Sequence, residues 1–293
     1  MTGNDLQRRR IALFVAIAVG IAAVVGAVLS ATGGLRRSPE IGGVALSTLL
    51  LPTAYMFSPA VANAATRLLT DEGRDDLRLR PNLSGEWPGY VAAWLGTSAL
   101  IGVGFWLYAA LGRTGLVPPA PVGPRVGTTA LVASLTIGPA VNTFAAAGEE
   151  LGWRGYLLPK LEPLGARRAL VAHGAVWGVW HWPLIAMGYN YGFVYPLAPW
   201  SGLATMTVAA VAVGTVFGAL SMRTDSVWPV ALAHGTFNAV GSLGAVVSGV
   251  GLVGAVPVGL VGVLPWAAVA GAVLALADGG RSADPAAGDA GVA

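Results

Sequence analysis

The sequence predicts an all-α, polytopic membrane protein with about eight transmembrane helices, and three observations support this fold class. Of its 293 residues, 55% are hydrophobic and only 11% are charged, whereas about 25% of the residues in a soluble domain are charged. The mean hydropathy is +0.68. Apolar runs of about 20 residues, the length that crosses a bilayer, recur along the chain. The lipid bilayer is therefore the expected surroundings of most of these residues.

The expected spans follow from the apolar runs between polar or Gly/Pro-rich breaks. In chain order they cover residues 11–31, 41–69, 87–111, 126–147, 169–187, 202–222, 227–247 and 251–276. The second is too long for a straight span, so we expect Pro52 and Pro59 to kink it. We predict three regions: spans one to three in 1–125, a core of spans four to seven in 126–247, and the last span with a disordered tail in 248–293.

Charge and cysteine content limit the location and the possible partners. If the N-terminus is cytoplasmic, most of the 17 basic residues fall on the cytoplasmic side, as the positive-inside rule requires. We therefore predict a multi-pass protein of the cell (plasma) membrane with both termini in the cytoplasm. The net charge of +3 is spread over the membrane flanks and gives no signal for a nucleic-acid partner. With no cysteine, a thiolate nucleophile, a disulfide and a cysteine zinc site are all excluded.

Two acidic residues and an arginine end the fourth span. Glu150 and Arg154 are four residues apart, with the acid on the N-terminal side, which is the favourable order for an ion pair on one helical face. Glu149 lies on a different face and has no local partner. Charges in membrane segments are rare and usually mark a functional site. We therefore expect Arg154 to hold Glu150 and to leave Glu149 free to act on a substrate.

The remaining candidate residues are histidines and an asparagine in later spans. His181 lies in the fifth span, and His234 in the seventh shares a helical face with Asn238, four residues later. Simpler roles exist for each: His181 lies among tryptophans that resemble an interfacial aromatic belt, and His234 and Asn238 could serve interhelical hydrogen bonding. His173 matches no motif, and we expect a structural role for it.

These residue types suit hydrolysis of an amide inside the membrane. A carboxylate can act as general base toward water, two imidazoles can hold that water or a metal, and an asparagine amide can donate to a tetrahedral oxyanion. The sequence contains no His-Glu-x-x-His, which argues against zinc proteases with that helix motif. It also contains no Gly-x-Ser-x-Gly and no membrane-embedded aspartate pair, so serine and aspartyl mechanisms lose support.

Three motifs in this order resemble those of the type II CAAX prenyl endopeptidase and bacteriocin-processing family, also called CPBP or Abi. They are Glu-Glu-x-x-x-Arg at residues 149–154, aromatic-x-x-x-His at 177–181 and His-x-x-x-Asn at 234–238. The family consists of intramembrane proteases thought to depend on a metal or on glutamate. The second motif often has Phe where this chain has Trp177. We expect this difference to change the packing volume, and we expect no polar role for the tryptophan.

The resemblance implies a role for each matched residue. Glu149 would activate water, with Glu150 and Arg154 as its structural pair. His181 and His234 would hold the water or a metal, and Asn238 would stabilise the oxyanion. Glu149, His181 and His234 could coordinate Zn²⁺, or orient water without it, and the sequence leaves both open.

The expected function is therefore an intramembrane endopeptidase, a CAAX-protease-like metalloendopeptidase if the metal is present. Its substrate would be a membrane protein or peptide, lipidated or not. The alternative is a non-proteolytic membrane protein, such as an immunity or scaffold protein or a transporter, that retains the motifs. A transporter would show related halves, and no internal repeat is visible.

Three shorter segments carry weaker expectations. Residues 152–168 alternate apolar and charged side chains, which predicts a short helix lying at the membrane interface. The aromatic loop at 189–200 is expected to anchor at the headgroups. Gly174 and Gly178 have the spacing of closely packed helices, although in a chain with 42 glycines such a spacing also arises by chance.

Overall fold

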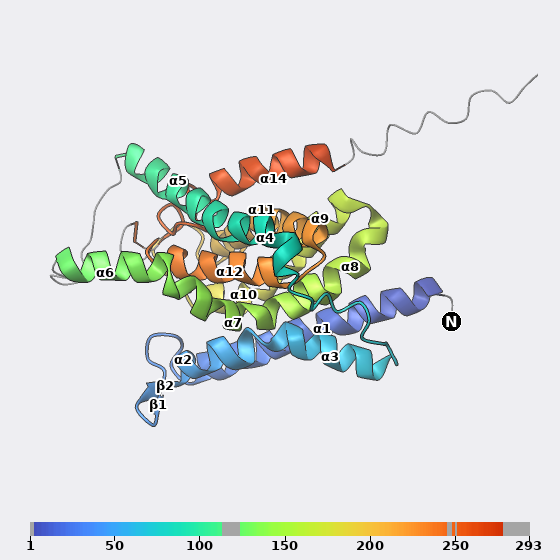
Figure 1. Cartoon of the computed structure of the whole chain (residues 1–293). Coiled ribbons are helices and arrows are strands. Elements are labelled where there is room, and N and C mark those ends of the chain that lie inside the picture. Colours follow the sequence, from blue (N-terminus) through green and yellow to red (C-terminus); the bar gives the residue numbers. More distant parts are fainter. Residues whose placement is uncertain (1–2, 113–123, 245–247, 250, 278–293) are drawn as a thin grey trace, which may run out of the picture.

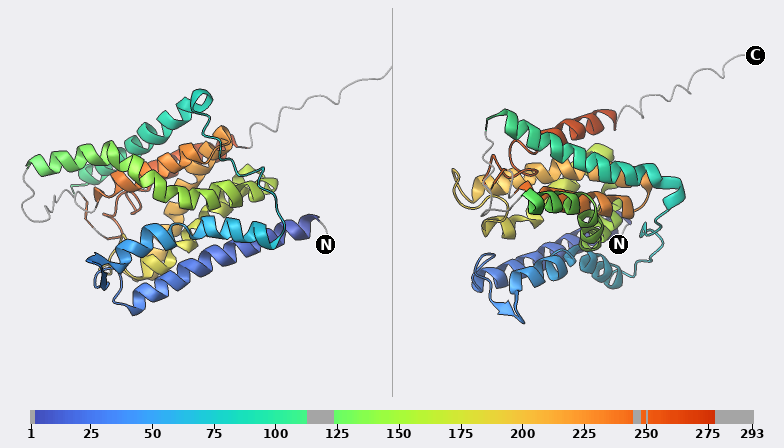
Figure 2. Two further views of the ribbon diagram at one scale, coloured as in Figure 1. Left: turned by 60° about the horizontal axis from the view of Figure 1, so that its bottom comes forward. Right: turned by 60° about the vertical axis from the view of Figure 1, so that its left-hand side comes forward.

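The chain is organised as layers of packed helices (Figure 1). The computed structural model describes residues 3–112, 124–244, 248–249 and 251–277, and helices dominate them. In Figure 1, α1 (Gly3–Ala31) and α3 (Ser58–Leu69) lie side by side on one side of the molecule, and α5 (Thr97–Ala110) and α14 (Leu264–Leu276) lie on the opposite side. Between them in Figure 1 lie α7 (Ile137–Gly152) and α12 (Trp228–Gly241). The further views in Figure 2 keep this layering. The predicted disordered tail lies outside the described residues.

The N-terminal elements are mostly helical, with one short antiparallel hairpin. In order they are α1 (Gly3–Ala31), β1 (Glu40–Ile41), β2 (Val44–Ala45), α2 (Leu46–Leu50), a π-helical turn (Leu51–Tyr55), α3 (Ser58–Leu69), α4 (Leu83–Val91), a second π-helical turn (Ala92–Gly96) and α5 (Thr97–Ala110). The predicted second span is therefore divided, with Pro52 inside the π-helical turn and Pro59 in the first turn of α3. The hairpin is a small departure from the all-α prediction.

The C-terminal elements carry the motifs. In order they are α6 (Pro124–Leu135), α7 (Ile137–Gly152), a π-helical turn (Trp153–Leu157), α8 (Leu158–Leu161), a 3₁₀ turn (Glu162–Leu164), α9 (Ala166–Trp180), α10 (Trp182–Ala186), α11 (Trp200–Thr224), α12 (Trp228–Gly241) and α14 (Leu264–Leu276).

The predicted count of eight spans is not confirmed. Among the described residues, three helical stretches are long and apolar enough to cross a membrane: Gly3–Ala31, Leu83–Ala110 and Trp200–Thr224. A fourth candidate is a bent pair, 127–135 with 137–164, whose halves meet at 51°. The other predicted spans correspond to shorter or interrupted helices. The chain is thus a mostly helical membrane protein with three or four candidate spans.

The bend before α7 has a local cause. Pro139 has no N–H to donate to the carbonyl four residues earlier, and its ring crowds that position. The carbonyl in question belongs to Leu135, and it accepts a hydrogen bond from the indole N–H of Trp94 at 2.8 Å. As a result, α7 runs in a different direction from the helix before it.

The glycine pair of α9 is used for packing. A Cβ on Gly174 would lie 2.6 Å from the Cα of Val211, and one on Gly178 would lie 2.7 Å from the Cα of Thr207. Real Cβ atoms do not approach a backbone so closely, so both glycines are needed where α9 crosses α11. The spacing of Gly174 and Gly178 therefore marks a real contact between α9 and α11.

The segment after α7 is not an interfacial helix, so that prediction was wrong. Trp153, Arg154, Tyr156, Leu157 and Leu158 are all at most 1% exposed. The ring of Phe14 on α1 lies 5.5 Å from that of Trp153 and 5.1 Å from that of Tyr156. A helix from far upstream therefore covers the face that the sequence pattern assigned to the membrane surface.

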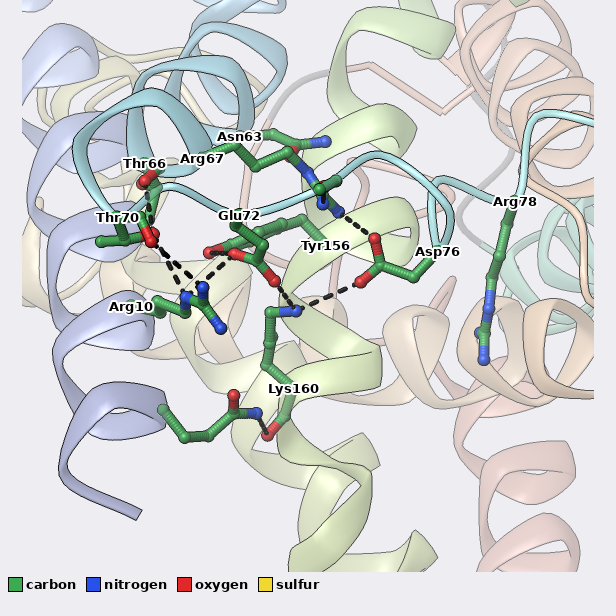
Figure 3. A network of polar contacts seen from close by, with 12 residues as sticks. Arg10, Asn63, Thr66, Arg67, Thr70, Glu72, Asp76, Arg78, Tyr156 and Lys160 are labelled. Atoms are coloured by element: carbon green, nitrogen blue, oxygen red, sulfur yellow. Dashed lines mark hydrogen bonds and ion pairs between the residues drawn. The ribbon is translucent and has the colours of Figure 1, made fainter. Parts of the chain in front are cut away.

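An ion-pair network fastens this segment to α1, α3 and the loop between α3 and α4 (Figure 3). Glu72 in the loop pairs with Lys160 and, at 3.2 Å, with Arg10 of α1. Asp76 bonds Lys160 at 3.2 Å and Arg67 of α3 at 2.7 Å. The network explains why a chain segment containing Lys160 can be packed against the bundle.

Candidate active site

Four of the six predicted site residues, from three parts of the chain, meet at one cavity of about 500 Å³. Glu149 of α7, His181 at the junction of α9 and α10, and His234 and Asn238 of α12 all line it. The rest of the lining is mainly apolar. It includes Leu51, Met56, Leu184, Met206, Val213, Phe237 and Val258. The cavity therefore combines a small polar cluster with a long apolar wall.

Small residues bring the helices of the site together. A Cβ on Gly235 would lie 2.6 Å from the backbone N of Thr143, so α12 can approach α7 closely only with glycine beside His234. On the other face of α7, a Cβ on Gly152 would lie 2.4 Å from a backbone carbon of Pro59. Because α7 is tightly packed on both faces, the carboxylates that it carries are held in fixed positions.

Glu150 and Arg154 form the predicted ion pair behind the cavity. Nη1 of Arg154 donates to Oε1 of Glu150 at 2.8 Å, and both side chains are fully buried. The guanidinium carbon lies 4.5 Å from the centre of the Trp177 ring. Neither residue lines the cavity. They therefore support the site from behind.

His234 joins this pair to the cavity. Its Nδ1 lies 2.7 Å from Oε1 of Glu150, an oxygen that also accepts from Arg154 and can only accept here. The proton of this bond therefore lies on Nδ1, and the neutral ring has its lone pair on Nε2. Nε2 lies 3.8 Å from Oε1 of Glu149.

His181 has the same tautomer for a similar reason. Its Nδ1 lies 2.8 Å from the backbone carbonyl of Trp177, and a carbonyl can only accept. Nδ1 therefore carries the proton, and the neutral ring has its lone pair on Nε2. Both histidines at the cavity thus have one nitrogen fixed by a neighbour and the other available as an acceptor.

Glu149 has a partner that the sequence did not reveal. Its side chain is buried, and Oε2 accepts a hydrogen bond from the indole N–H of Trp177 at 2.9 Å. The expectation that tryptophan at this position has no polar role was wrong. The other oxygen, Oε1, is the one that faces His234.

Asn238 lies at the cavity with its amide uncommitted. Within the described residues no hydrogen bond is formed by this side chain, which makes it available to a bound group. Asn142 and Tyr189 also line the cavity and were not predicted. Asn142 could have been found from its position seven residues, or two turns, before Glu149 on the same face of α7. Tyr189 lies in the loop that was assigned to the headgroups.

His173 is not part of the cavity. It is fully buried, and neither ring nitrogen has a hydrogen-bond partner. Its ring stands edge-on to that of Trp153, with centres 6.3 Å apart. This position is consistent with the structural role expected from the sequence.

The donor types around the cavity suit a divalent metal ion. Zinc accepts histidine nitrogens and carboxylate oxygens, and ligating histidines usually have the other nitrogen bonded to an oxygen, as here. Within the described part of the chain, however, no three His, Asp or Glu side chains are grouped closely enough to hold an ion. The donor types therefore fit zinc, although in this structure the three side chains are not gathered into such a group.

Comparison with known proteins points to one family. The family profile described as type II CAAX prenyl endopeptidase Rce1-like matches residues 127–240. This segment contains all six predicted site residues and Trp177. A similar curated protein is CAAX prenyl protease 2 of Methanococcus maripaludis, which is 38% identical over 61 residues. That alignment covers 20% of this chain and 22% of the relative, so the similarity spans about a fifth of either protein. The resemblance indicated by the motifs is confirmed over residues 127–240, where the chain is similar to the type II CAAX prenyl endopeptidases.

Proposed function

We propose that the chain is an intramembrane endopeptidase that hydrolyses a peptide bond of a membrane-associated protein or peptide. The observation that carries the proposal is the shared cavity, where a carboxylate, two imidazoles and an amide from α7, α9–α10 and α12 meet among apolar side chains. The family match over the same residues supports a protease. A hydrolytic site inside a membrane protein needs this combination of buried polar groups and an apolar binding wall.

In the proposed mechanism Glu149 activates water. A water bound between Oε1 of Glu149 and Nε2 of His234 attacks the carbonyl carbon of the scissile amide while Glu149 takes its proton. The amide of Asn238 donates to the oxyanion of the tetrahedral intermediate. Glu149 then gives the proton to the amide nitrogen as the C–N bond breaks, which yields a carboxylic acid and an amine.

The remaining polar groups orient these reactants. Nε2 of His181 accepts from a substrate N–H. Glu150 keeps the proton of His234 on Nδ1, so that Nε2 stays an acceptor, and Arg154 holds Glu150 in place. The distances of 2.7 and 2.8 Å in this chain support such a role.

Metal dependence is a separate part of the proposal. Glu149, His181 and His234 are the residues that would hold Zn²⁺, which when bound would activate water or polarise the attacked carbonyl. Elemental analysis of the purified protein tests this. One zinc per chain that is lost in both His181→Gln and His234→Gln would assign these ligands. Absence of zinc in active wild-type protein would leave water as the only group that the imidazoles hold.

The activity assay uses the protein in proteoliposomes. Two probes carry the same peptide sequence, one anchored by a farnesylated cysteine and one by a transmembrane segment, and product masses identify the cleaved bond. Wild type is expected to cleave at least one probe, whereas Glu149→Gln should lose at least about 10²-fold in kcat. The matched control is Glu162→Gln, because Glu162 is a partly exposed acid that pairs with Arg78 at 3.3 Å, away from the cavity.

The same assay separates the alternative of a non-proteolytic membrane protein. Equal cleavage by wild type and Glu149→Gln would refute the mechanism. If neither cleaved either probe or a broader set of membrane peptides, a protein that retains the motifs without the activity would be favoured. The convergence of the site residues on one cavity favours the enzyme.

We also propose a multi-pass arrangement in the cell membrane, with both termini in the cytoplasm. The absence of cysteine makes the orientation directly measurable, since a single introduced thiol is the only labelling site. Arg9 lies in the N-terminal part of α1 and Arg36 follows its C-terminal end, and both residues are exposed. A membrane-impermeant maleimide should label Arg9→Cys only from the cytoplasmic side and Arg36→Cys only from the outside.

A further inference from the structure

Trp177 contacts several of the polar residues of the site at once. Its indole N–H donates to Glu149 at 2.9 Å, and its backbone carbonyl accepts from His181 at 2.8 Å. Its ring centre lies 5.5 Å from that of His234 and 5.4 Å from that of His181. The Arg154 guanidinium lies over its face. Trp177 therefore contacts four of the polar residues of the site: Glu149, Arg154, His181 and His234.

Only one of these contacts requires tryptophan. A phenylalanine at this position would keep the backbone carbonyl, the edge-on packing against the imidazoles and an aromatic face beneath Arg154. It would lack the N–H. The chemical difference between the two residues is therefore confined to the hydrogen bond on Oε2 of Glu149.

That bond distinguishes the two oxygens of Glu149. The carboxylate has rotational freedom about its terminal torsion, and its surroundings are mainly apolar. With Oε2 held by the indole, Oε1 is left facing Nε2 of His234 at 3.8 Å. The oxygen that must take a proton from water is thereby aimed at the imidazole that would hold that water.

We propose that Trp177 is a positioning residue for Glu149, whose indole N–H fixes Oε2 and so presents Oε1 to the water. This inference rests on the proposed function for its kinetic consequence, while the hydrogen bond itself can be tested without turnover. Phenylalanine cannot replace the contact, because it has no N–H to donate.

The kinetic test compares Trp177→Phe with wild type in proteoliposomes. A hydrogen bond to a charged group is expected to contribute about 10- to 100-fold in rate. The loss should appear in kcat, with KM changed by less than about threefold, because the bond acts on the reacting carboxylate and not on substrate binding. The matched control is Trp182→Phe, which removes an indole N–H bonded to Thr207 at 3.1 Å outside the cavity.

The second test is spectroscopic. With ¹⁵N-labelled indoles, the ten tryptophans give separate N–H resonances, and the Trp177 resonance is the one missing from Trp177→Phe. In Glu149→Gln it should shift upfield, because a carboxylate acceptor is replaced by a weaker amide, while the Trp182 resonance stays in place. If Trp177→Phe fails to fold, a resonance that shifts in Glu149→Gln and is retained in the nine other Trp→Phe variants makes the same assignment.

The outcomes separate this inference from the proposed function. If wild type cleaves and Glu149→Gln does not, but Trp177→Phe keeps wild-type kcat, Trp177 has no positioning role and the protease mechanism stands. If no variant cleaves, an unshifted Trp177 resonance in Glu149→Gln overturns the contact, and a shifted one supports it. A rise in KM with kcat unchanged would instead indicate a role in substrate binding and would also overturn the proposal.

Discussion

Arg154→Met should destabilise the protein strongly because it leaves a buried carboxylate with too few partners. Arg154 and Glu150 are both fully buried and 2.8 Å apart. Removing one member of a buried ion pair typically costs about 3–5 kcal/mol of unfolding free energy. Methionine retains much of the length of the arginine side chain, so most of this loss should come from the uncompensated charge and not from a cavity.

A second substitution should return part of that stability. In Glu150→Met/Arg154→Met no charge remains, and apolar replacement of a whole buried pair is often neutral. In the wild-type chain, Nδ1–H of His234 bonds Glu150 at 2.7 Å. In the double variant this N–H is left without an acceptor. A buried donor without a partner costs about 1–3 kcal/mol. The double variant should therefore be about 2 kcal/mol more stable than Arg154→Met and still inactive, because His234 has lost its orienting acceptor.

Denaturation in mixed detergent micelles, followed by circular dichroism, measures these differences. Arg223→Met is the control, because Arg223 is exposed and substitutions at such positions usually change stability by less than about 0.5 kcal/mol. A double variant no more stable than Arg154→Met would contradict the assignment of the loss to an unpaired charge. A loss no larger than that of Arg223→Met would show that the pair contributes little.

Two further predictions concern packing and pH. Gly174→Ala should cost about 1–3 kcal/mol, since its Cβ would lie 2.6 Å from the Val211 backbone, whereas Gly102→Ala, with no atom near the new Cβ, should be neutral or slightly stabilising. Equal stability of the two variants in the same micelle assay would contradict the close crossing of α9 and α11. For Asp76, burial raises the pKa of the carboxyl, but the hydrogen bond from Arg67 and the nearby cationic charges outweigh it and hold the pKa below its ordinary value. Its stabilising effect should be complete above the unfolded pKa of about 3.9 and lost as pH falls through the lower folded pKa. Between about pH 3 and 7, the thermal unfolding temperature should therefore fall less on the acid side for Asp76→Asn than for wild type. Parallel curves for the two proteins would contradict this role of Asp76.

Local sequence rules predicted the elements of the site well. The four-residue spacing of Glu150 and Arg154 predicted an ion pair that the structure forms, and the shared face of His234 and Asn238 places both at the cavity. These results depend only on helical periodicity. Glycine spacing in α9 also indicated a helix crossing, although the sequence alone could not separate it from chance.

Contacts between distant segments were not predictable in the same way. The segment after α7 resembled an interfacial helix, because the pattern does not reveal that Phe14 covers its apolar face or that Glu72 pairs with Lys160. The indole of Trp177 could not be assigned to Glu149, since the two are 28 residues apart and on different helices. The expected eight spans counted each apolar run as one crossing of the membrane, whereas in the structure turns and bends interrupt several of these runs.

The central claim is that Glu149 and His234 act together on one water, and a double-substitution cycle tests it most directly. Single-turnover cleavage is measured for wild type, Glu149→Gln, His234→Gln and the combined variant. Residues that act as a unit give strongly non-additive losses, so the combined variant should be no slower than the slower single variant. A combined loss equal to the product of the two single losses would show that the two side chains act independently.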